Sequence, residues 1–298
     1  VVGLWRRMAL LQLARQANVI VVLRKAFSPT FCAALRGSSG RRRPAPRTLI
    51  YDIDDALFAS DDGHANPRAA RRFARMAASV DEVWAGNDYL AYEAARHTAV
   101  TVLPTSVDVS DYAGLPVPHD SSHFDLVWIG SSATRKYLES ALPMLVEASR
   151  QIPTLRLKIV ADFDLPAARA MGIATLAVPW SEETQSDALR SADVGIAPLP
   201  DDPWTRGKCG LKIIQYMAAA LPVIASPVGA QTAIVQDRYT GFLAENPADW
   251  VEALRILHQD LALRGAMGTA GRARAATHFS TEATFPKMLA ALEALVAP

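Results

Sequence analysis

Residues 207–229 read Gly-Lys-Cys-Gly-Leu-Lys-Ile-Ile-Gln-Tyr-Met-Ala-Ala-Ala-Leu-Pro-Val-Ile-Ala-Ser-Pro-Val-Gly. Gly207 and Gly210 open a turn, and apolar residues then recur at helical spacing, which predicts a helix with one apolar face. Pro222 ends this helix, and a short β-prone run follows at residues 223–225 before a second loop. The stretch therefore predicts a loop, a helix, a strand and a loop, which is the unit from which α/β folds are built.

The charge at the start of this predicted helix is unusual. Lys208 and Lys212 lie where the helix dipole disfavours cations by about 0.3–1 kcal/mol, and no acidic residue in the stretch offsets them. A positive, glycine-flanked helix start suits an anion such as a phosphate. A buried helix with two solvated lysines is the alternative interpretation.

Strand and helix patterns alternate along the whole chain. A polar segment rich in Pro, Asp and Ser, residues 104–122, interrupts this alternation. The pattern indicates parallel α/β sheets, and the interruption indicates two of them. The expected strands cover residues 18–23, 48–51, 80–85, 100–103, 124–129, 155–160, 174–178, 193–197 and 223–225. Helices are expected at residues 27–36, 66–78, 88–97, 136–151, 165–170, 183–190, after Gly210, and at 247–258, 260–277 and 283–296.

The composition is that of a globular protein. The chain has 298 residues, of which 50% are hydrophobic and 20% charged, so one large or two medium domains are expected. Cys32 and Cys209 are the only cysteines, which favours a reducing, cytoplasmic compartment without a disulfide framework. The sequence contains no run of eighteen uncharged apolar residues and no recognised nucleic-acid module, so neither a transmembrane helix nor a nucleic-acid partner is expected.

The first fifty residues are strongly basic, with ten Arg and Lys and no acid. This excess could contact an anionic membrane surface, peripherally at its inner face, or an anionic acceptor. A solvated helix face followed by a basic loop is the favoured alternative. The basic residues are Arg6, Arg7, Arg15, Arg24, Lys25, Arg36, Arg41, Arg42, Arg43 and Arg47.

Acidic residues follow the expected strand at 48–51, in the sequence Asp52-Ile53-Asp54-Asp55. Ligands of parallel sheets bind at the carboxyl ends of strands, so these carboxylates have three interpretations. They could hold magnesium or manganese, they could cap a helix, or they could contact a bound ligand, which the resemblance described next would make an acceptor or reacting sugar. No histidine has metal-ligand spacing, and Trp180, after another strand, could stack on a nucleobase or simply pack.

Residues 216–223, Tyr-Met-Ala-Ala-Ala-Leu-Pro-Val, resemble the sugar-donor-binding helix of retaining GT-B glycosyltransferases of family 4, also called group 1. The family pattern has two glutamates and a glycine that this chain lacks. Gly207 stands in place of the first glutamate, Gln215 in place of the second, and Ala220 in place of the glycine.

Other segments extend the resemblance over residues 100–280, and more loosely over residues 18–100. Pro104 to Asp108 is similar to the interdomain linker of the family, and Ile129 to Lys136 is similar to the first loop of its C-terminal domain. In that loop Ser131 replaces an arginine, while Lys136 matches a lysine that reaches the diphosphate. Residues 192–198 and 229–243 resemble the strand before the sugar-donor loop and the segment after it.

The resemblance implies a GT-B fold of the α/β class, with two Rossmann-like domains facing a cleft. Residues 1–105 would be a partial acceptor-side domain, 106–122 a linker, 123–280 the nucleotide-sugar-binding domain and 281–298 a C-terminal helix. The family's first strand and glycine loop are not found, and the chain starts at Val1 rather than Met. We therefore expect it to be N-terminally truncated.

The resemblance also implies a hexosyltransferase of glycan biosynthesis that moves a sugar from a nucleoside diphosphate sugar to an acceptor hydroxyl with retention. The acceptor would be a glycan, a lipid-linked molecule or a small molecule, and neither a metal nor another cofactor is expected. The alternative is a non-catalytic relative that binds a nucleotide sugar or a partner. The residues assigned to catalysis are Asp52, Asp54, Asp55, Lys136 and Lys208. Those assigned to sugar-donor binding are Gly130, Ser131, Ser132, Trp180, Gly210, Leu211, Lys212, Gln215 and Gly229.

Overall fold

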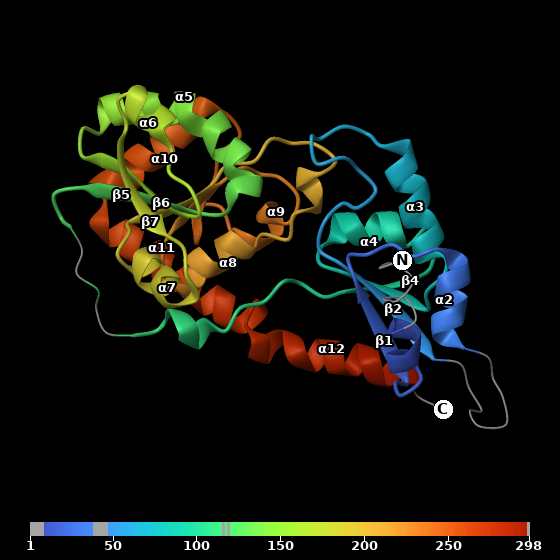
Figure 1. Ribbon diagram of the computed structural model, residues 1–298. Coiled ribbons are helices and arrows are strands. Elements are labelled where there is room, and N and C mark those ends of the chain that lie inside the picture. The colour runs from blue at the N-terminus through green and yellow to red at the C-terminus, as the bar shows by residue number, and fades with distance from the viewer. Residues whose placement is uncertain (1–8, 38–46, 115–116, 118–119, 297–298) are drawn as a thin grey trace. The chain divides into compact units, whose positions relative to one another are not determined.

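The computed structural model describes residues 9–37, 47–114, 117 and 120–296, and these fall into two units (Figure 1). Unit 1 contains Val1–Thr105, Asp202–Cys209 and Phe285–Pro298, and unit 2 contains Ser106–Asp201 and Gly210–Thr284. We expected residues 123–280 to form one domain. Residues 202–209 belong instead to unit 1, so the chain leaves unit 2 for eight residues and returns to it at Gly210.

Unit 1 is built on a parallel sheet of four strands in the order β1-β2-β3-β4. Its central strands are buried on both faces, as apolar runs of parallel sheets usually are. Asn66 caps the amino end of α3 by accepting a hydrogen bond from the Ala69 amide, and Pro67 occupies the first helical position. The strands are β1 (Val19–Leu23), β2 (Thr48–Ile53), β3 (Glu82–Ala85) and β4 (Ala99–Val102), and the helices are α2 (Pro29–Arg36), α3 (Pro67–Ala77) and α4 (Asp88–Ala94).

Unit 2 has a parallel sheet of six strands in the order β10-β9-β8-β5-β6-β7. The chain builds outward from β5 to β7 and then resumes on the other side of β5 with β8, so the strand order reverses between β5 and β8. The strands are β5 (Phe124–Ile129), β6 (Leu155–Ala161), β7 (Ala174–Pro179), β8 (Val194–Ala197), β9 (Val223–Ala225) and β10 (Gly241–Leu243). The helices are α5 (Arg135–Gln151), α6 (Pro166–Ala170), α7 (Glu182–Arg190), α8 (Leu211–Ala218), α9 (Gln231–Ile234), α10 (Pro247–Gln259) and α11 (Leu261–His278), and α12 (Thr281–Val296) follows them.

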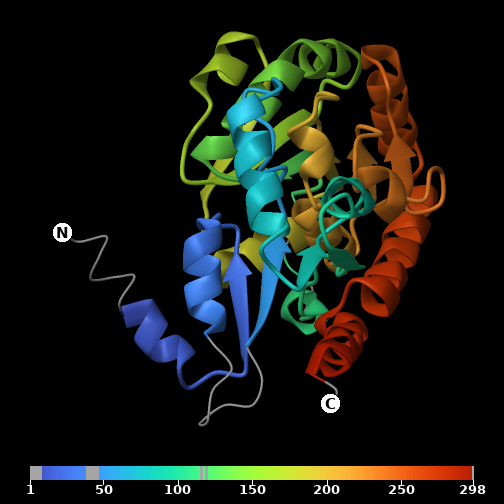
Figure 2. The ribbon, with the colours of Figure 1, turned by 90° about the vertical axis from the view of Figure 1, so that its right-hand side faces the viewer.

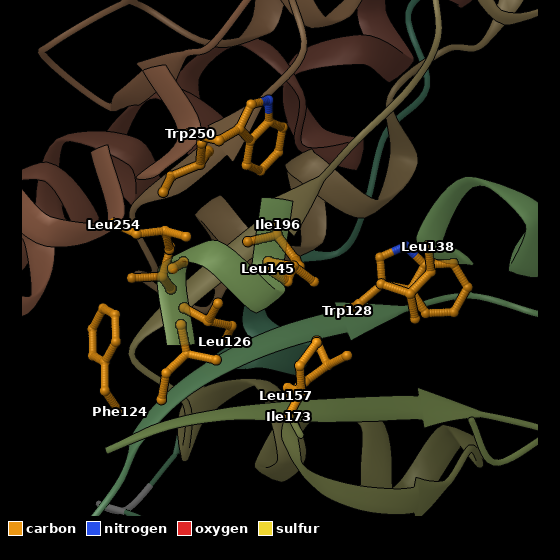
Figure 3. Close-up of a cluster of buried hydrophobic side chains, with 14 of the residues drawn as sticks. Phe124, Leu126, Trp128, Leu138, Leu145, Leu157, Ile173, Ile196, Trp250 and Leu254 are labelled. Carbon is orange, nitrogen blue, oxygen red and sulfur yellow. The ribbon is translucent and has the colours of Figure 1, made fainter. Parts of the chain in front are cut away.

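The two faces of β5 serve two hydrophobic cores. Phe124, Leu126 and Trp128 alternate along one face and pack with α5 and α10, whose Leu145 and Leu254 are fully buried (Figure 3). Val127 and Ile129 face the other way and pack with α8. Because side chains of a strand alternate between faces, this single strand fixes helices on both sides of the sheet.

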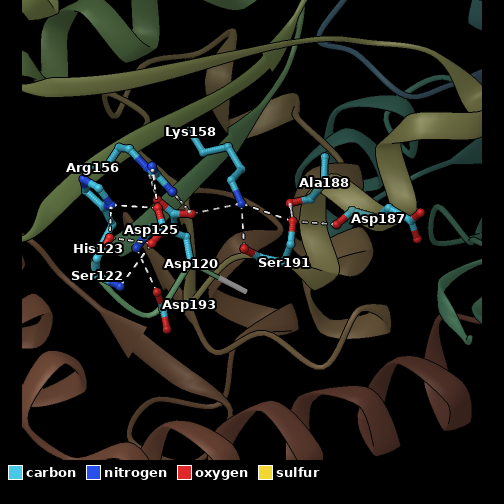
Figure 4. Close-up of polar contacts among 10 residues, drawn as sticks. All are labelled: Asp120, Ser122, His123, Asp125, Arg156, Lys158, Asp187, Ala188, Ser191 and Asp193. Carbon is cyan, nitrogen blue, oxygen red and sulfur yellow. Dashed lines mark hydrogen bonds and ion pairs between the residues drawn. The ribbon is translucent and has the colours of Figure 1, made fainter. Parts of the chain in front are cut away.

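A buried charge network ties together the amino-terminal parts of the unit 2 strands (Figure 4). Asp125 accepts hydrogen bonds from Arg156 at 2.7 and 2.9 Å and pairs with Lys158 at 3.1 Å. Burial alone would raise the pKa of Asp125, but the hydrogen bonds from Arg156 and the charge of Lys158 lower it below its ordinary value. Lys158 also donates to the Ser191 carbonyl at 2.6 Å. Each buried charge of this network is paired. We therefore assign the network a structural role.

Candidate functional site

The reversal of strand order in unit 2 marks a place where ligands bind in open α/β sheets. β5 and β8 pair only at Leu126 with Val194 and at Val127 with Gly195, and beyond these residues the two strands part. The hydroxyl of Tyr216 fills the gap, accepting a hydrogen bond from the Ile129 amide at 3.0 Å and donating to the Ile196 carbonyl at 3.2 Å. Burial raises the pKa of Tyr216, so this hydroxyl stays neutral.

Gly195 makes this arrangement possible, because a Cβ at that position would lie 2.4 Å from the ring of Tyr216. Tyr216 is fully buried and holds the carboxyl ends of β5 and β8 in place. Sequence reasoning did not assign it a role, although a tyrosine on the apolar side of a helix, whose hydroxyl needs a hydrogen-bond partner, was a usable signal.

The loop after β5 carries three of the predicted residues, Gly130, Ser131 and Ser132. A Cβ on Gly130 would lie 2.2 Å from the indole of Trp128, so only glycine fits there. The Ser132 amide and hydroxyl donate to the Asp162 carboxylate at 2.8 and 2.6 Å. A ligand anion at Ser132 would therefore have to displace Asp162.

The start of α8 lies beside this loop. Gly210 has a left-handed backbone (φ 73°) immediately before Leu211, and no side chain caps the helix. The ammonium of Lys212 lies 4.3 Å from the ring centroid of Trp128, the same indole that packs under Gly130. One tryptophan thus joins the β5 loop to the first turn of α8.

Gln185, which was not predicted as a site residue, links two residues that were, Trp180 and Gln215. Its side-chain oxygen accepts hydrogen bonds from the Trp180 indole at 3.3 Å and from the Gln215 amide at 3.4 Å. Gln215 also donates to the Tyr112 hydroxyl at 3.0 Å. Trp180 remains 48% exposed, so its ring is accessible to a ligand.

The remaining two predicted residues of unit 2 are Lys136 and Gly229. Lys136 lies in the first turn of α5, with its ammonium 5.3 Å from the Tyr137 ring centroid. Gly229 lies in the loop after β9 with φ 55°. Both follow carboxyl ends of strands and stay candidates on position alone. A cavity of about 570 Å³ in unit 2 lies at the opposite edge of the sheet, where Arg264 pairs with Asp193, and contains none of the candidates.

The acidic cluster of unit 1 is an ion-pair network. Asp55 is almost buried and pairs with Lys208 at 2.7 Å and with Arg24. Arg24 also contacts Asp54 at 2.7 Å, and its own amide donates to the Asp52 carbonyl at 2.9 Å. Arg24 has a left-handed backbone (φ 57°), an uncommon conformation for a residue other than glycine. The side chains of Arg24 and Lys208 and the carboxylates of Asp54 and Asp55 therefore lie together at the carboxyl ends of β1 and β2.

One expectation and one alternative interpretation of these residues were wrong. Lys208 is not an uncompensated cation at a helix start: it precedes α8, belongs to unit 1, and is paired with Asp55. Asp52 to Asp55 do not cap a helix either, because turns follow β2 and the next helix begins at Pro67. In the described part of the chain, no group of three or more His, Cys, Asp or Glu is arranged to hold a metal ion.

The packing around Gly207 leaves no room for the first glutamate that the resemblance predicts at this position. A Cβ at this buried position would lie 2.6 Å from both the backbone nitrogen and the Cβ of Ala56. Cys209, two residues later, is a poor nucleophile, since burial raises the pKa of its thiol to about 12. Cys32 and Cys209 are both free thiols.

Burial and the negative charge of Asp54 raise the pKa of Asp52. We expect Asp52→Asn to be more stable than the native chain at neutral pH, because the charged form of Asp52 is disfavoured in the folded state. The raised folded-state pKa means that folding takes up a proton. The gain should therefore be full above the folded-state pKa and disappear as the pH falls to the unfolded value of about 3.9.

Urea unfolding of Asp52→Asn between pH 4 and 8 measures this pH dependence. Asp54→Asn is the matched control and should lose stability, since it removes a partner of Arg24. A loss of stability in Asp52→Asn at pH 7 would show that the charged form of Asp52 is needed.

Comparison with known proteins agrees with this architecture. Residues 123–260 match the family model described as glycosyl transferases group 1. The D-inositol 3-phosphate glycosyltransferase of Segniliparus rotundus is 28% identical over 225 residues, which are 68% of this chain and 49% of that protein. The chain thus spans about half the length of this curated relative.

Solved structures show the same fold. Sucrose-phosphate synthase from Thermosynechococcus elongatus has a TM-score of 0.72 at 18% identity, covering 95% of this chain and 74% of its own. Anabaena HepE in complex with UDP has a TM-score of 0.73 at 15% identity, covering 97% of this chain and 82% of its own. The two parallel sheets are therefore those of the GT-B fold. The chain therefore has the GT-B fold, and its residues 123–260 are similar to the group 1 glycosyl transferases.

Proposed function

We propose that the protein transfers a sugar from a nucleoside diphosphate sugar to an acceptor hydroxyl, with retention of configuration. The observation that carries the proposal is the contact of Trp128 with both Gly130 and Lys212, which brings a glycine loop and a cationic, uncapped helix start together where β5 and β8 part. Such a helix start favours a diphosphate. The HepE neighbour was solved in complex with UDP, which supports a nucleotide as the ligand in this proposal.

In this proposal unit 2 binds the nucleotide and stabilises the leaving diphosphate. The amide groups at the start of α8, together with Lys136 and Lys212, would lower the energy of the negative charge that develops as the glycosidic bond breaks. Gln215 would bind ribose hydroxyls, and the exposed ring of Trp180 would stack on the base. The expected role of Lys208 changes, because its charge is already shared with Asp55.

Unit 1 would serve the acceptor. Asp54 and Asp55 can orient an acceptor hydroxyl or balance positive charge on the sugar, and Arg24 and Lys208 hold them in place. No side chain of the cluster is a convincing covalent nucleophile, so retention rests on the resemblance. The acceptor in this proposal is a glycan, a lipid-linked molecule or a small molecule with a free hydroxyl.

Calorimetric titration with UDP tests the nucleotide site, with GDP and ADP as comparisons. We expect Gln215→Ala to weaken binding by about tenfold, the cost of about one hydrogen bond with a polar group left unpaired. Gln151→Ala is the matched control, because Gln151 lies on α5 and its side chain, among the described residues, donates only to Glu147. Affinity should not change in EDTA, since the proposed site uses no metal. Equal affinity of Gln215→Ala and the native chain would exclude this site.

A second function is a nucleotide-sugar-binding relative without transferase activity. The packing of Gly207 against Ala56 favours it, because that packing excludes the first glutamate of the family pattern. Ser131 in place of an arginine points the same way. Donor hydrolysis by the full-length protein separates the two functions: nucleotide-sugar binding without any turnover would establish the second.

Membrane contact through the basic first fifty residues stays a prediction. Arg6, Arg7 and Arg41 to Arg43 lie outside the described residues. Arg36 pairs with Asp81 at 2.8 Å, and Arg47 donates to the Leu35 and Arg36 carbonyls. In the described ranges, no helix has the length and hydropathy needed to cross a bilayer.

A further inference from the structure

Helix α3 carries a row of arginines on its solvent side, here called the arginine stripe: Arg68, Arg71, Arg72 and Arg75. Their spacing of i, i+3, i+4 and i+7 places all four on one helix face over about 10 Å, at a rise of 1.5 Å per residue. The opposite face, with Phe73 and Met76, is buried in the core of unit 1. All four arginines are exposed.

The arginine stripe is not neutralised by the part of unit 1 that the structure describes. Within those residues, none of the four side chains makes a hydrogen bond or an ion pair, and α3 itself contains no acid. Asp81, just beyond the helix, is already paired with Arg36. Like charges at i, i+3 and i, i+4 destabilise a helix, and a cation in its first turn adds to this cost. The charge arrangement is therefore unfavourable unless an anion is bound.

A cavity of about 440 Å³ lies against the stripe. Its other wall is the connection between β1 and α2, residues 26–29, and α2 and α3 are neighbours in unit 1 (Figure 2). Phe27 fixes this wall, because its amide lies 3.3 Å from the Met76 sulfur of α3 and its ring packs edge-on against Phe31 at 4.9 Å. The volume is within the range of about 300–1,000 Å³ that small-molecule sites occupy.

We propose that this cavity binds a compact ligand carrying at least two phosphate groups. A guanidinium fork matches a phosphate with two parallel hydrogen bonds, so two pairs of arginines can hold two phosphates. Phe27 and Pro29 offer apolar contact to the rest of the ligand. This site uses neither the ion pairs of Asp55 nor any residue of unit 2, so it is independent of the proposed transfer.

Calorimetry with inorganic tripolyphosphate, without any nucleotide, tests the site. The stripe variant changes all four arginines: R68Q, R71Q, R72Q and R75Q. Its matched control removes the same charge from four arginines that are each paired with an acid: R96Q, R150Q, R169Q and R255Q. We expect the stripe variant to bind at least about tenfold more weakly than the native chain, and the control to bind normally. Equal losses in both variants, or no binding to the native chain, would overturn the proposal.

A lysine version of the stripe variant, with R68K, R71K, R72K and R75K, keeps the charge but removes the forks. It should bind tripolyphosphate more weakly than the native chain. Its circular dichroism spectrum is the control for the folding of α3. Vesicles of phosphatidylglycerol and phosphatidylcholine provide the other source of phosphate. Stripe-dependent binding to vesicles without binding to tripolyphosphate would overturn the cavity site in favour of a membrane surface.

Discussion

Asp55→Asn is expected to lower the rate of transfer by about 100-fold or more, the scale of removing one preorganised electrostatic group from an active site. The substitution keeps the shape of the side chain but removes the charge that Lys208 and Arg24 share. Stability should fall by about 1–3 kcal/mol, because two cations lose their common partner while retaining access to solvent. Nucleotide affinity should stay unchanged, since the proposed nucleotide residues belong to unit 2.

Transfer assays, calorimetry with UDP and urea unfolding of the same protein separate these effects. Asp54→Asn should show a smaller fall, because Asp54 is more exposed than Asp55 and contacts only Arg24 among the cations of the cluster. Asp62→Asn is the matched control on an exposed loop of unit 1. Normal turnover by a folded Asp55→Asn protein would leave the cluster with a structural role only.

Gly207→Ala is expected to destabilise unit 1 by about 1–3 kcal/mol, the usual cost of forcing an extra carbon into a packed site. The new Cβ would meet the backbone of Ala56, and backbone atoms cannot move aside as a side chain can. Because Lys208 is the next residue, its ion pair with Asp55 should weaken as well. Transfer should therefore fall together with stability.

Urea unfolding followed by tryptophan fluorescence measures this loss. Gly265→Ala is the control, because nothing lies within 4 Å of the added carbon and the residue is inside α11. It should gain up to about 1 kcal/mol, as glycine is unfavourable inside a helix. A Gly207→Ala protein as stable as the native chain would show that Ala56 can yield, and that packing does not exclude a side chain there.

Most of the secondary structure was predictable because long apolar runs and helical periodicity are local signals. β5 has the expected bounds, residues 124–129, and α5 begins within one residue of its expected start. The α9 helix and the strand β10 were not predicted, since three or four residues are too few to show a period. The GT-B fold itself was expected from motifs around residues 207–229 and is shown by the structural neighbours.

The site was predictable only where it depends on strand ends. Gly130 and Trp180 follow β5 and β7, and a parallel sheet brings such positions to one edge. The pair of Lys208 with Asp55 joins residues 153 positions apart, and nothing local to either residue indicates the other. Arg24 was counted among the basic residues, but its position after β1, beside β2, became apparent only from the strand pairing.

The eight-residue excursion of the chain into unit 1 has a consequence for biosynthesis. Trp204, Lys208 and Cys209 complete the surroundings of Asp55, yet they are made long after the strands that carry the carboxylates. During synthesis on the ribosome, the ion pair between Asp55 and Lys208 can form only after Lys208 has emerged. Contacts between residues so far apart in the sequence also form slowly. A fragment cut after Thr105 would expose the apolar core of unit 1 that Trp204 and Cys209 cover, so we expect it to be less stable than the same unit in the native chain.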